Sequence, residues 1–235
     1  MYEKLLSWIS YAPIGVPRYA GGAFIYEGKI YFIGGKTTTG RPTTAVEVVD
    51  IMTLQRSYGE PAPIPIAHFA HAFDGRYFYV IGGLTTGDNF LKKVLRYDPE
   101  QNLWTDLGDI LPKGIARACF ALTDPDTPKG YLMGGVDENG NIIATTYEID
   151  LSTPTVTEKA AMSTARENHA CGYLGGYVYV FGGDNGSSIF DTIEKYDPAT
   201  DTWEQLSSTL PDALTGITAT KIKINNKEYI LIIGG

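Results

Sequence analysis

The sequence FYVIGG at residues 78–83 decides the fold, because a closely similar sequence, VYVFGG, occurs at 178–183. Short aromatic or aliphatic runs ending in Gly-Gly occur five times, with first glycines at Gly34, Gly82, Gly134, Gly182 and Gly234. Their spacing alternates between 48 and 52 residues, so the chain also repeats at 100 residues. A fixed period near 50 residues indicates a repeat fold in which each repeat is one supersecondary unit.

Each unit is predicted to contain four short strands. In the fourth unit they are NHACGYL, YVYVF, TIEKY and TWEQL, with turns at Gly175-Gly176 and at DPAT. The last two strands repeat at the longer period, because LRYDPEQNLW ending at Trp104 matches EKYDPATDTW ending at Trp203. Short strands about ten residues apart, with turn residues between them, indicate an all-β fold, and four strands per 50-residue unit favour a β-propeller.

The series of an arginine, YVFGG, YDP and tryptophan resembles the Kelch repeat over essentially the whole chain. The resemblance implies a propeller that binds a peptide or small ligand on one loop face. Two departures qualify it. The first and third units have RSYGE and TVTEK in place of the fourth-strand tryptophan, and the second has Ile66 where an arginine is expected. Tryptophan packing is therefore expected in alternate blades only.

The chain ends suggest how the ring closes. Residues 215–235 supply two strands of a unit, while Tyr2-Glu3 and Trp8 resemble the missing third and fourth strands. We therefore predict one domain over 1–235, a five-bladed Kelch-type β-propeller whose last blade is closed by strands from both termini, which hides sheet edges. The alternative is a fragment of a six-bladed propeller.

Composition limits the partners. With 19 Lys and Arg against 27 Asp and Glu, the net charge is −8, which disfavours nucleic acid and anionic membrane surfaces. The N-terminal residues make a poor signal peptide, and two cysteines are too few for a disulfide-stapled secreted scaffold. We expect a cytoplasmic protein with no cofactor.

The candidate binding face carries the loops after the second and fourth strands of each unit, because longer loops on a rigid scaffold are where binding usually occurs. Arg18, Arg117 and Arg166 align just before the first strands of their units, where guanidinium groups would pair with carboxylates. The alternative is that each arginine bonds loop carbonyls as a structural part of its repeat. The predicted ligand-binding residues are Arg18, Tyr19, Lys36, Arg41, His68, Arg117, Arg166 and Asn185.

A second predicted ring lies on the first strands: Ala23, His71, Cys119, Cys171 and Ala219. His and Cys are zinc-ligand types, and His169 is close in sequence, but a free cysteine is more commonly a buried small apolar residue. No C-x-x-C pair or G-x-S-x-G sequence supports a metal or a catalytic nucleophile. We therefore expect no metal site and no catalytic residues, and assign Asp98, Asp150 and Asp197 to turns.

The sequence thus favours a non-catalytic binding module for a protein, a peptide or a small acidic ligand. Two alternatives stay open. One is a sugar-acting enzyme resembling a sialic-acid epimerase or mutarotase, and the other is a minimal structural propeller without a ligand. Fold alone does not separate them, because function depends on the site and not on the scaffold.

Overall fold

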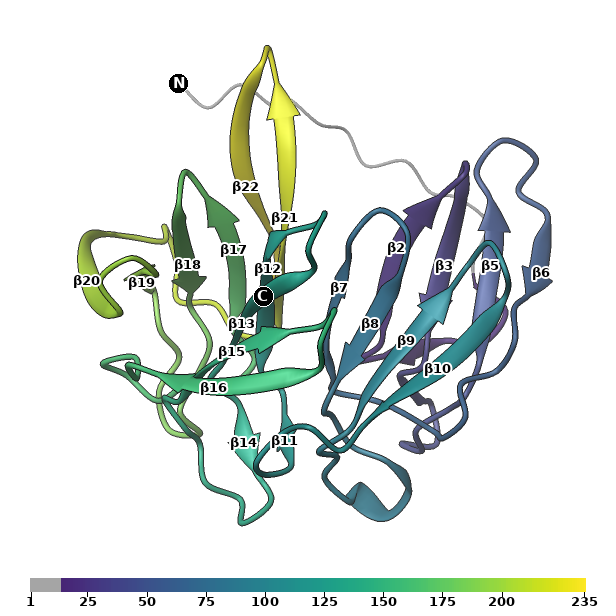
Figure 1. The fold of residues 1–235 in the computed structure, drawn as a ribbon, viewed down its shortest axis with the longest axis horizontal. Helices are drawn as coiled ribbons and strands as arrows, with labels where there is room; N and C mark the ends of the chain where they lie inside the picture. Colours follow the sequence, from purple (N-terminus) through teal and green to yellow (C-terminus); the bar gives the residue numbers. More distant parts are fainter. Residues whose placement is uncertain (1–13) are drawn as a thin grey trace.

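The computed structural model describes residues 14–235, which fold into antiparallel β-sheets (Figure 1). Four sheets have four strands each, and we call them blades 1 to 4. Blade 1 comprises β2 (Gly22–Tyr26), β3 (Lys29–Ile33), β5 (Val46–Asp50) and β6 (Arg56–Tyr58), and blade 2 comprises β7 (Ala70–Phe73), β8 (Phe78–Ile81), β9 (Val94–Asp98) and β10 (Leu103–Gly108). Blade 3 comprises β12 (Cys119–Asp124), β13 (Lys129–Met133), β15 (Thr146–Asp150) and β16 (Thr155–Lys159), and blade 4 comprises β17 (Ala170–Leu174), β18 (Tyr177–Phe181), β19 (Thr192–Asp197) and β20 (Thr202–Thr209).

The fifth unit is a two-stranded hairpin of β21 (Ile217–Ile224) and β22 (Lys227–Gly234). Short connections add the pairs β1 (Arg18–Tyr19) with β4 (Lys36–Thr37) and β11 (Ile115–Ala116) with β14 (Val136–Asp137), and a 3-10 turn at Thr86–Asp88. The all-β prediction of four-stranded units is confirmed. The predicted strands at Tyr2-Glu3 and Trp8 lie outside the described residues, so the five-blade count stays a prediction.

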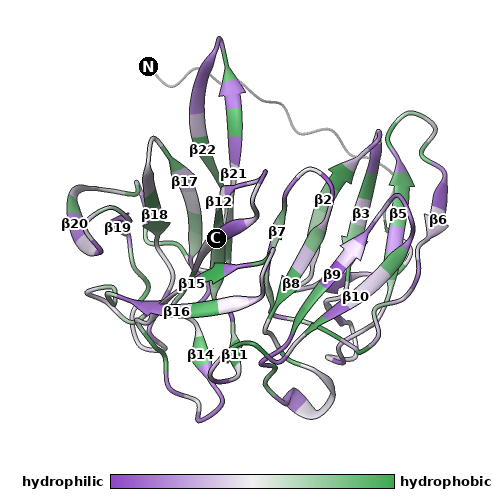
Figure 2. Ribbon diagram, in the orientation of Figure 1, coloured by the Kyte–Doolittle hydropathy of each residue, from purple (hydrophilic) through white to green (hydrophobic). Residues whose placement is uncertain are grey.

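The hydrophobic core lies between neighbouring blades rather than within one of them. One cluster joins Phe24 and Val48 of blade 1 to Phe78 and Tyr97 of blade 2. Equivalent clusters join blades 2 and 3, blades 3 and 4, and blade 4 and the final hairpin. Figure 2 shows the resulting hydrophobic residues along β2 and β8. Each sheet is therefore stabilised mainly by its neighbours, as expected when no single repeat can bury its own apolar faces.

The glycine pairs allow the close approach of successive blades. At Gly34, which has φ 59°, an added Cβ would lie 2.6 Å from the carbonyl oxygen of Ile66 in the next unit. Gly35 donates its N–H to the same carbonyl at 2.8 Å. The repeated Gly-Gly is thus needed both for its backbone conformation and for the lack of a side chain.

The tryptophans of alternate units clamp the outer strands. Trp104 packs on Tyr97 and donates its indole N–H to the carbonyl of Glu60 in the preceding unit at 2.8 Å. One hundred residues later the same contacts recur, because Trp203 packs on Tyr196 and bonds the Ala160 carbonyl at 2.9 Å. The prediction of tryptophan packing in alternate blades is confirmed.

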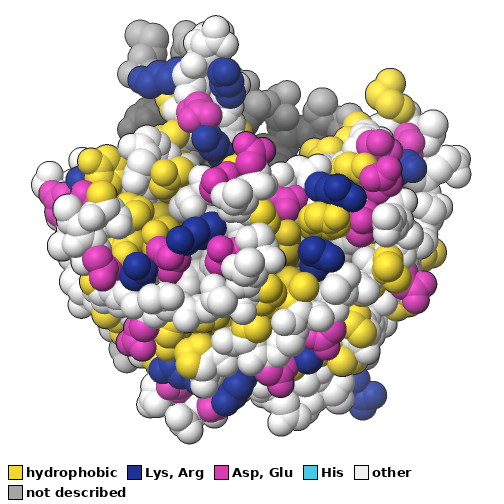
Figure 3. All heavy atoms as spheres, in the orientation of Figure 1, with side chains coloured by type: hydrophobic (Ala, Val, Ile, Leu, Met, Phe, Trp, Pro, Cys, Tyr) yellow, Lys and Arg dark blue, Asp and Glu magenta, His cyan; other side chains and the backbone are white. Residues whose placement is uncertain are grey.

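The surface is charged but mixed. On the face drawn in Figure 3, basic and acidic side chains alternate rather than gathering into one patch of a single sign. Within residues 14–235, no helix is both long enough and apolar enough to cross a membrane.

Candidate functional site

The first strands of the four blades and β21 converge on one cavity of about 480 Å³. Each unit contributes a short segment that runs from the loop before the inner strand into that strand. The lining residues are Tyr19–Gly21, His68–His71, Arg117–Phe120, Asn168–Cys171 and Gly216–Ala219. A cavity of this size is in the range of small-ligand sites and is lined by equivalent segments of all five units, so it is the candidate site.

Five residues at equivalent positions form what we call the mouth ring: Ala20, His68, Arg117, Asn168 and Gly216. All have positive φ, between 52° and 65°. The N–H of His68 donates to Ala20 O at 2.8 Å, and that of Arg117 donates to His68 O at 2.8 Å. The bonds continue from Asn168 to Arg117 O at 3.0 Å and from Gly216 to Asn168 O at 2.9 Å. The mouth ring therefore fixes the position and direction of each inner strand.

Two of the predicted ligand arginines are buried in ion pairs. Arg166 is fully buried and bonds Glu194, also fully buried, at 2.7 Å, as well as the Gly182 carbonyl at 2.7 Å. Arg18, with 5% of its side chain exposed, bonds the buried Glu47 at 2.5 Å. Both therefore have the structural role that the sequence left as the alternative, bonding within their repeats rather than facing the cavity.

The predicted alignment of Arg117 with these two arginines is wrong by two residues. Counted from the mouth ring, the equivalents of Arg18 and Arg166 are Ile66, Ile115 and Leu214. The backbone bonds agree, because the second glycines of successive pairs bond the carbonyls of Ile66, Ile115, Arg166 and Leu214. The predicted position of Arg117 is shifted because the first hairpin of the third unit is longer than in the other three blades, with a register shift between Leu122 and Asp124.

The corrected alignment shows three residues that change together. Where the arginine is present, its unit has a buried glutamate on the third strand and a residue that donates its N–H to that glutamate. These sets are Gly15, Arg18 and Glu47 in the first unit, and Ser163, Arg166 and Glu194 in the fourth. The corresponding sets are Pro63, Ile66 and Leu95 in the second unit, and Pro112, Ile115 and Tyr147 in the third. Proline has no N–H, so the units without a glutamate leave no orphaned donor.

Arg117 is the arginine that reaches the mouth. Its side chain is 39% exposed, and its Nη1 bonds Glu167 at 2.8 Å. Beside it, the Asn168 amide donates to Asp184 at 3.1 Å, and Thr215 donates to the same carboxylate oxygen. Burial alone would raise the pKa of Asp184, but these hydrogen bonds and Arg117 lower it. Glu167, Asn168 and Asp184 were missed because the alignment hid the mouth ring.

His68 and its neighbours complete the mouth. Burial, assisted by Arg117 and Lys36, lowers the pKa of His68 to about 4, so the imidazole is neutral at pH 7. Tyr19 is exposed and lies edge-on to His68, with ring centroids 6.1 Å apart. Lys36 bonds Asp88 at 2.7 Å, and this bond lowers the pKa of Asp88. The mouth thus brings together cations, carboxylates and neutral donors.

The other two predicted residues do not line the cavity. Arg41 is exposed on the loop after β4. Asn185 is also exposed, and its side-chain oxygen accepts the N–H groups of Ser187 and Ser188, which closes its own turn. Of the eight predicted binding residues, Tyr19, His68 and Arg117 line the cavity, and Lys36 bears on it through its charge.

The second predicted ring also changes. Phe120, rather than Cys119, is equivalent to His71 and Cys171, because its partner Leu132 stands two residues before the glycine pair. Cys119 instead faces the next blade and forms a disulfide with Cys171. The expectation of free cysteines is therefore wrong, and the sulfurs weighed as zinc ligands bond each other. Among residues 14–235, no group of three or more His, Cys, Asp or Glu is arranged to hold a metal ion.

His169 occupies the position that Phe69 occupies in the second unit, packed between neighbouring glycine pairs. It is 4% exposed, and neither ring nitrogen has a hydrogen-bond partner within the described part of the chain. Burial, followed by the charge of Arg166, lowers the pKa of His169 to about 3. The side chain is therefore a neutral, packed aromatic ring at neutral pH.

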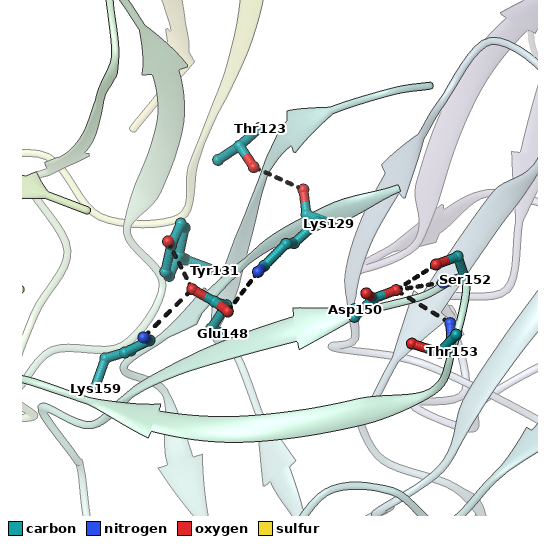
Figure 4. Close-up of polar contacts among 8 residues, drawn as sticks. All are labelled: Thr123, Lys129, Tyr131, Glu148, Asp150, Ser152, Thr153 and Lys159. Atoms are coloured by element: carbon teal, nitrogen blue, oxygen red, sulfur yellow. Dashed lines mark hydrogen bonds and ion pairs between the residues drawn. The ribbon is translucent and has the colours of Figure 1, made fainter. Parts of the chain in front are cut away.

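A polar cluster away from the cavity stabilises blade 3, which lacks the tryptophan clamp (Figure 4). Glu148 on β15 accepts from Tyr131 at 2.9 Å and pairs with Lys129 at 2.7 Å and Lys159 at 3.5 Å. In the same view, Asp150 accepts the N–H groups of Ser152 and Thr153. The turn role predicted for Asp150 is confirmed, and Asp98 and Asp197 make the same kind of turn bonds.

Comparisons with known proteins agree with this architecture. The Kelch motif matches residues 65–110 and 165–209. Kelch-like protein 25 of Xenopus tropicalis is 25% identical over 209 residues, covering 86% of this chain and 34% of that protein. Beta-scruin of Limulus polyphemus is 30% identical over 230 residues, covering 92% and 24%. N-acetylneuraminate epimerase of Salmonella arizonae is 32% identical over 143 residues, covering 53% and 36%.

A solved structure, that of YjhT, has a similar fold, with a TM-score of 0.72 at 18% identity. The likeness covers 91% of this chain and 72% of that one. The chain spans about a quarter to a third of the length of the curated relatives described above.

The buried Arg166–Glu194 pair should be replaceable only as a set. Arg166→Ile or Glu194→Leu alone leaves an unpaired buried charge, and each should lower the unfolding free energy by about 3–5 kcal/mol. Adding both changes together with Ser163→Pro copies the second unit and should restore most of that loss. Urea unfolding followed by tryptophan fluorescence measures all four proteins. A triple variant no more stable than the weaker single variant would contradict the assignment.

His169 should make stability depend on pH. Its pKa is about 3 when folded, against an ordinary value near 6.5, so the unfolded chain binds the proton first. Stability is then complete above pH 6.5 and falls as the pH drops towards 3, by up to about 1.4 kcal/mol per pH unit. In His169→Phe, which copies Phe69, this slope should be reduced in urea unfolding between pH 7.5 and 4. An unchanged slope would show that His169 is not its source.

Proposed function

This chain belongs to the Kelch repeat family, and we propose that it is a binding module whose recognition site is the mouth of the central cavity. The proposed ligand is an acidic segment of a partner protein, which places a carboxylate on Arg117. The observation that carries the proposal is the partly exposed side chain of Arg117 at the cavity mouth of an acidic protein.

The surroundings of Arg117 support this ligand class. Glu167 bonds one terminal nitrogen of its guanidinium, and no residue within 14–235 makes a hydrogen bond to the other. A guanidinium can hold a second carboxylate through its remaining N–H groups. Neutral His68, exposed Tyr19 and the Asn168 side chain stand beside it and supply uncharged contacts. Arg117 can thus bind one carboxylate of the ligand, while these neighbours, including neutral His68, add no further positive charge.

The cavity below the mouth suits an apolar group of the ligand. Its wall contains Ala70, Phe120, Ala170 and Ile217 together with the disulfide. A hydrophobic side chain next to the acidic residue would fill this part, since ligand sites commonly combine an apolar lining with a few directed polar groups. A sugar acid has hydroxyls on several sides and fits such a wall less well.

The second candidate function is a sugar-acting enzyme, favoured by the alignment of 53% of the chain with an N-acetylneuraminate epimerase. Glu167, Asp184 and His68 are the acid-base groups nearest Arg117. Each carboxylate is already engaged in hydrogen bonds, and His68 is neutral. These contacts favour the binding module over the enzyme.

Arg117→Ala should weaken binding of acidic peptides by about tenfold to a hundredfold, because a charge-assisted hydrogen bond contributes about 1.5–3 kcal/mol. The measurement is fluorescence anisotropy with labelled Glu- and Leu-containing peptides, with lysine-substituted peptides as the negative set. Arg76→Ala is the matched control, because it removes the same charge from an exposed turn outside the cavity lining.

Equal peptide affinity in the Arg117 and Arg76 variants would overturn the proposed site. Faster interconversion of N-acetylneuraminate anomers in proton NMR, lost in Arg117→Ala, would favour the enzyme instead. Absence of both peptide binding and sugar conversion would favour a structural propeller without a ligand.

We further propose that the ring has five blades, the last completed by the N-terminal residues. The support is the 50-residue period and the two-strand final unit. A chain lacking residues 1–13 should then unfold at lower urea concentration and self-associate through the edge of β22 in sedimentation experiments. A truncated chain that stays monomeric with unchanged stability would contradict five-blade closure.

A further inference from the structure

We propose that Cys119 and Cys171 form a thiol–disulfide exchange site in the cavity wall, open to a small dithiol that enters through the mouth. The cysteines belong to the inner strands β12 and β17, with Cα atoms 6.0 Å apart. Both line the cavity and are partly exposed, whereas Ala70 and Ala170, which stand at the position of Cys119 in neighbouring units, are buried. The disulfide is therefore accessible to a small molecule that enters this cavity.

The position of the cysteines shows that the cross-link is not needed to hold blades together. At each of the four junctions between successive units, the residue two places after the mouth-ring residue faces the residue three places after the next mouth-ring residue. The equivalents of Cys119–Cys171 are Gly22 with His71, Ala70 with Phe120, and Ala170 with Ala219. These three junctions pack without a covalent bond, so the disulfide adds chemistry to a junction that the fold already makes.

Other contacts between blades 3 and 4 would persist after reduction. The backbone bond from Asn168 to Arg117 O measures 3.0 Å, and the ion pair of Arg117 with Glu167 measures 2.8 Å. At the outer end, Trp203 bonds the Ala160 carbonyl. The interface is thus held at its inner and outer ends, so the disulfide can open and close without separation of the blades.

The exchange is a two-electron, two-proton reaction. A thiolate of the dithiol attacks one sulfur, forms a mixed disulfide and releases the other cysteine as a thiolate that takes up a proton. The second thiol of the dithiol then closes its own disulfide and releases the remaining cysteine. The protein disulfide is reduced to two thiols while the dithiol is oxidised to a cyclic disulfide.

The test uses the folded full chain and needs no peptide ligand, so its outcome is independent of the proposed binding function. Air-oxidised protein is incubated with dithiothreitol without denaturant and then alkylated with iodoacetamide. Mass spectrometry should show no alkylated cysteine before reduction and two after it, with the circular dichroism spectrum unchanged. Removal of the dithiol in air should restore the unalkylated protein to the disulfide form.

Cys119→Ala/Cys171→Ala is the matched control, because alanine occupies the equivalent positions Ala70, Ala170 and Ala219. It should fold with the same spectrum and lose the dithiol-dependent fall in melting temperature that the wild type shows. Cys119→Ala alone should leave Cys171 open to alkylation in the folded state. The proposal is overturned if the wild-type disulfide is reduced only after the protein is unfolded, or if both thiols are free after air oxidation.

Discussion

The structure depends on backbone hydrogen bonds that join the segments just before successive inner strands. In the mouth ring, the N–H of each residue from His68 to Gly216 bonds the carbonyl of the equivalent residue before it, at 2.8–3.0 Å. Because the bonds join equivalent positions, they fix the register between blades as well as their distance. The glycine pairs and the apolar clusters then fill the space that this register defines. Side chains can differ widely around the ring as long as this backbone contact is kept.

The architecture could be predicted because its strongest constraints are visible as residue types. Glycines that permit close backbone approach, and the tryptophans at 104 and 203, recur at regular spacing. The packing of Trp104 and Trp203 in alternate blades could be predicted from their spacing, since a packed indole ring needs both a packing surface and a hydrogen-bond acceptor. Closure of the ring is different. It depends on which strands meet across the chain ends, and a repeat pattern does not contain that information.

The site could be predicted only in part, because a small shift in alignment changes which side chains face the cavity. Arg117 does lie at the mouth, but it is not an equivalent of Arg18 and Arg166, because its unit has no buried glutamate on the third strand like Glu47 and Glu194. Glu47 and Glu194, which lie on the third strands, could have indicated the buried ion pairs, since a buried glutamate requires a nearby cation. The disulfide was hidden similarly, because adjacent rather than equivalent positions meet between blades, and a one-residue error placed both cysteines in one ring.

The left-handed backbone at the mouth restricts how this protein can vary. Four of the five mouth-ring positions carry a side chain at positive φ. Valine, isoleucine and threonine are strongly disfavoured there by their branched Cβ, whereas residues without a branched Cβ, such as the alanine, histidine, arginine, asparagine and glycine found here, are tolerated. Related chains that acquire new ligands would have to draw their rim residues from this set, or else change specificity through the loops around it. The backbone geometry that holds the blades together thereby limits which residue types can contact a ligand at the mouth.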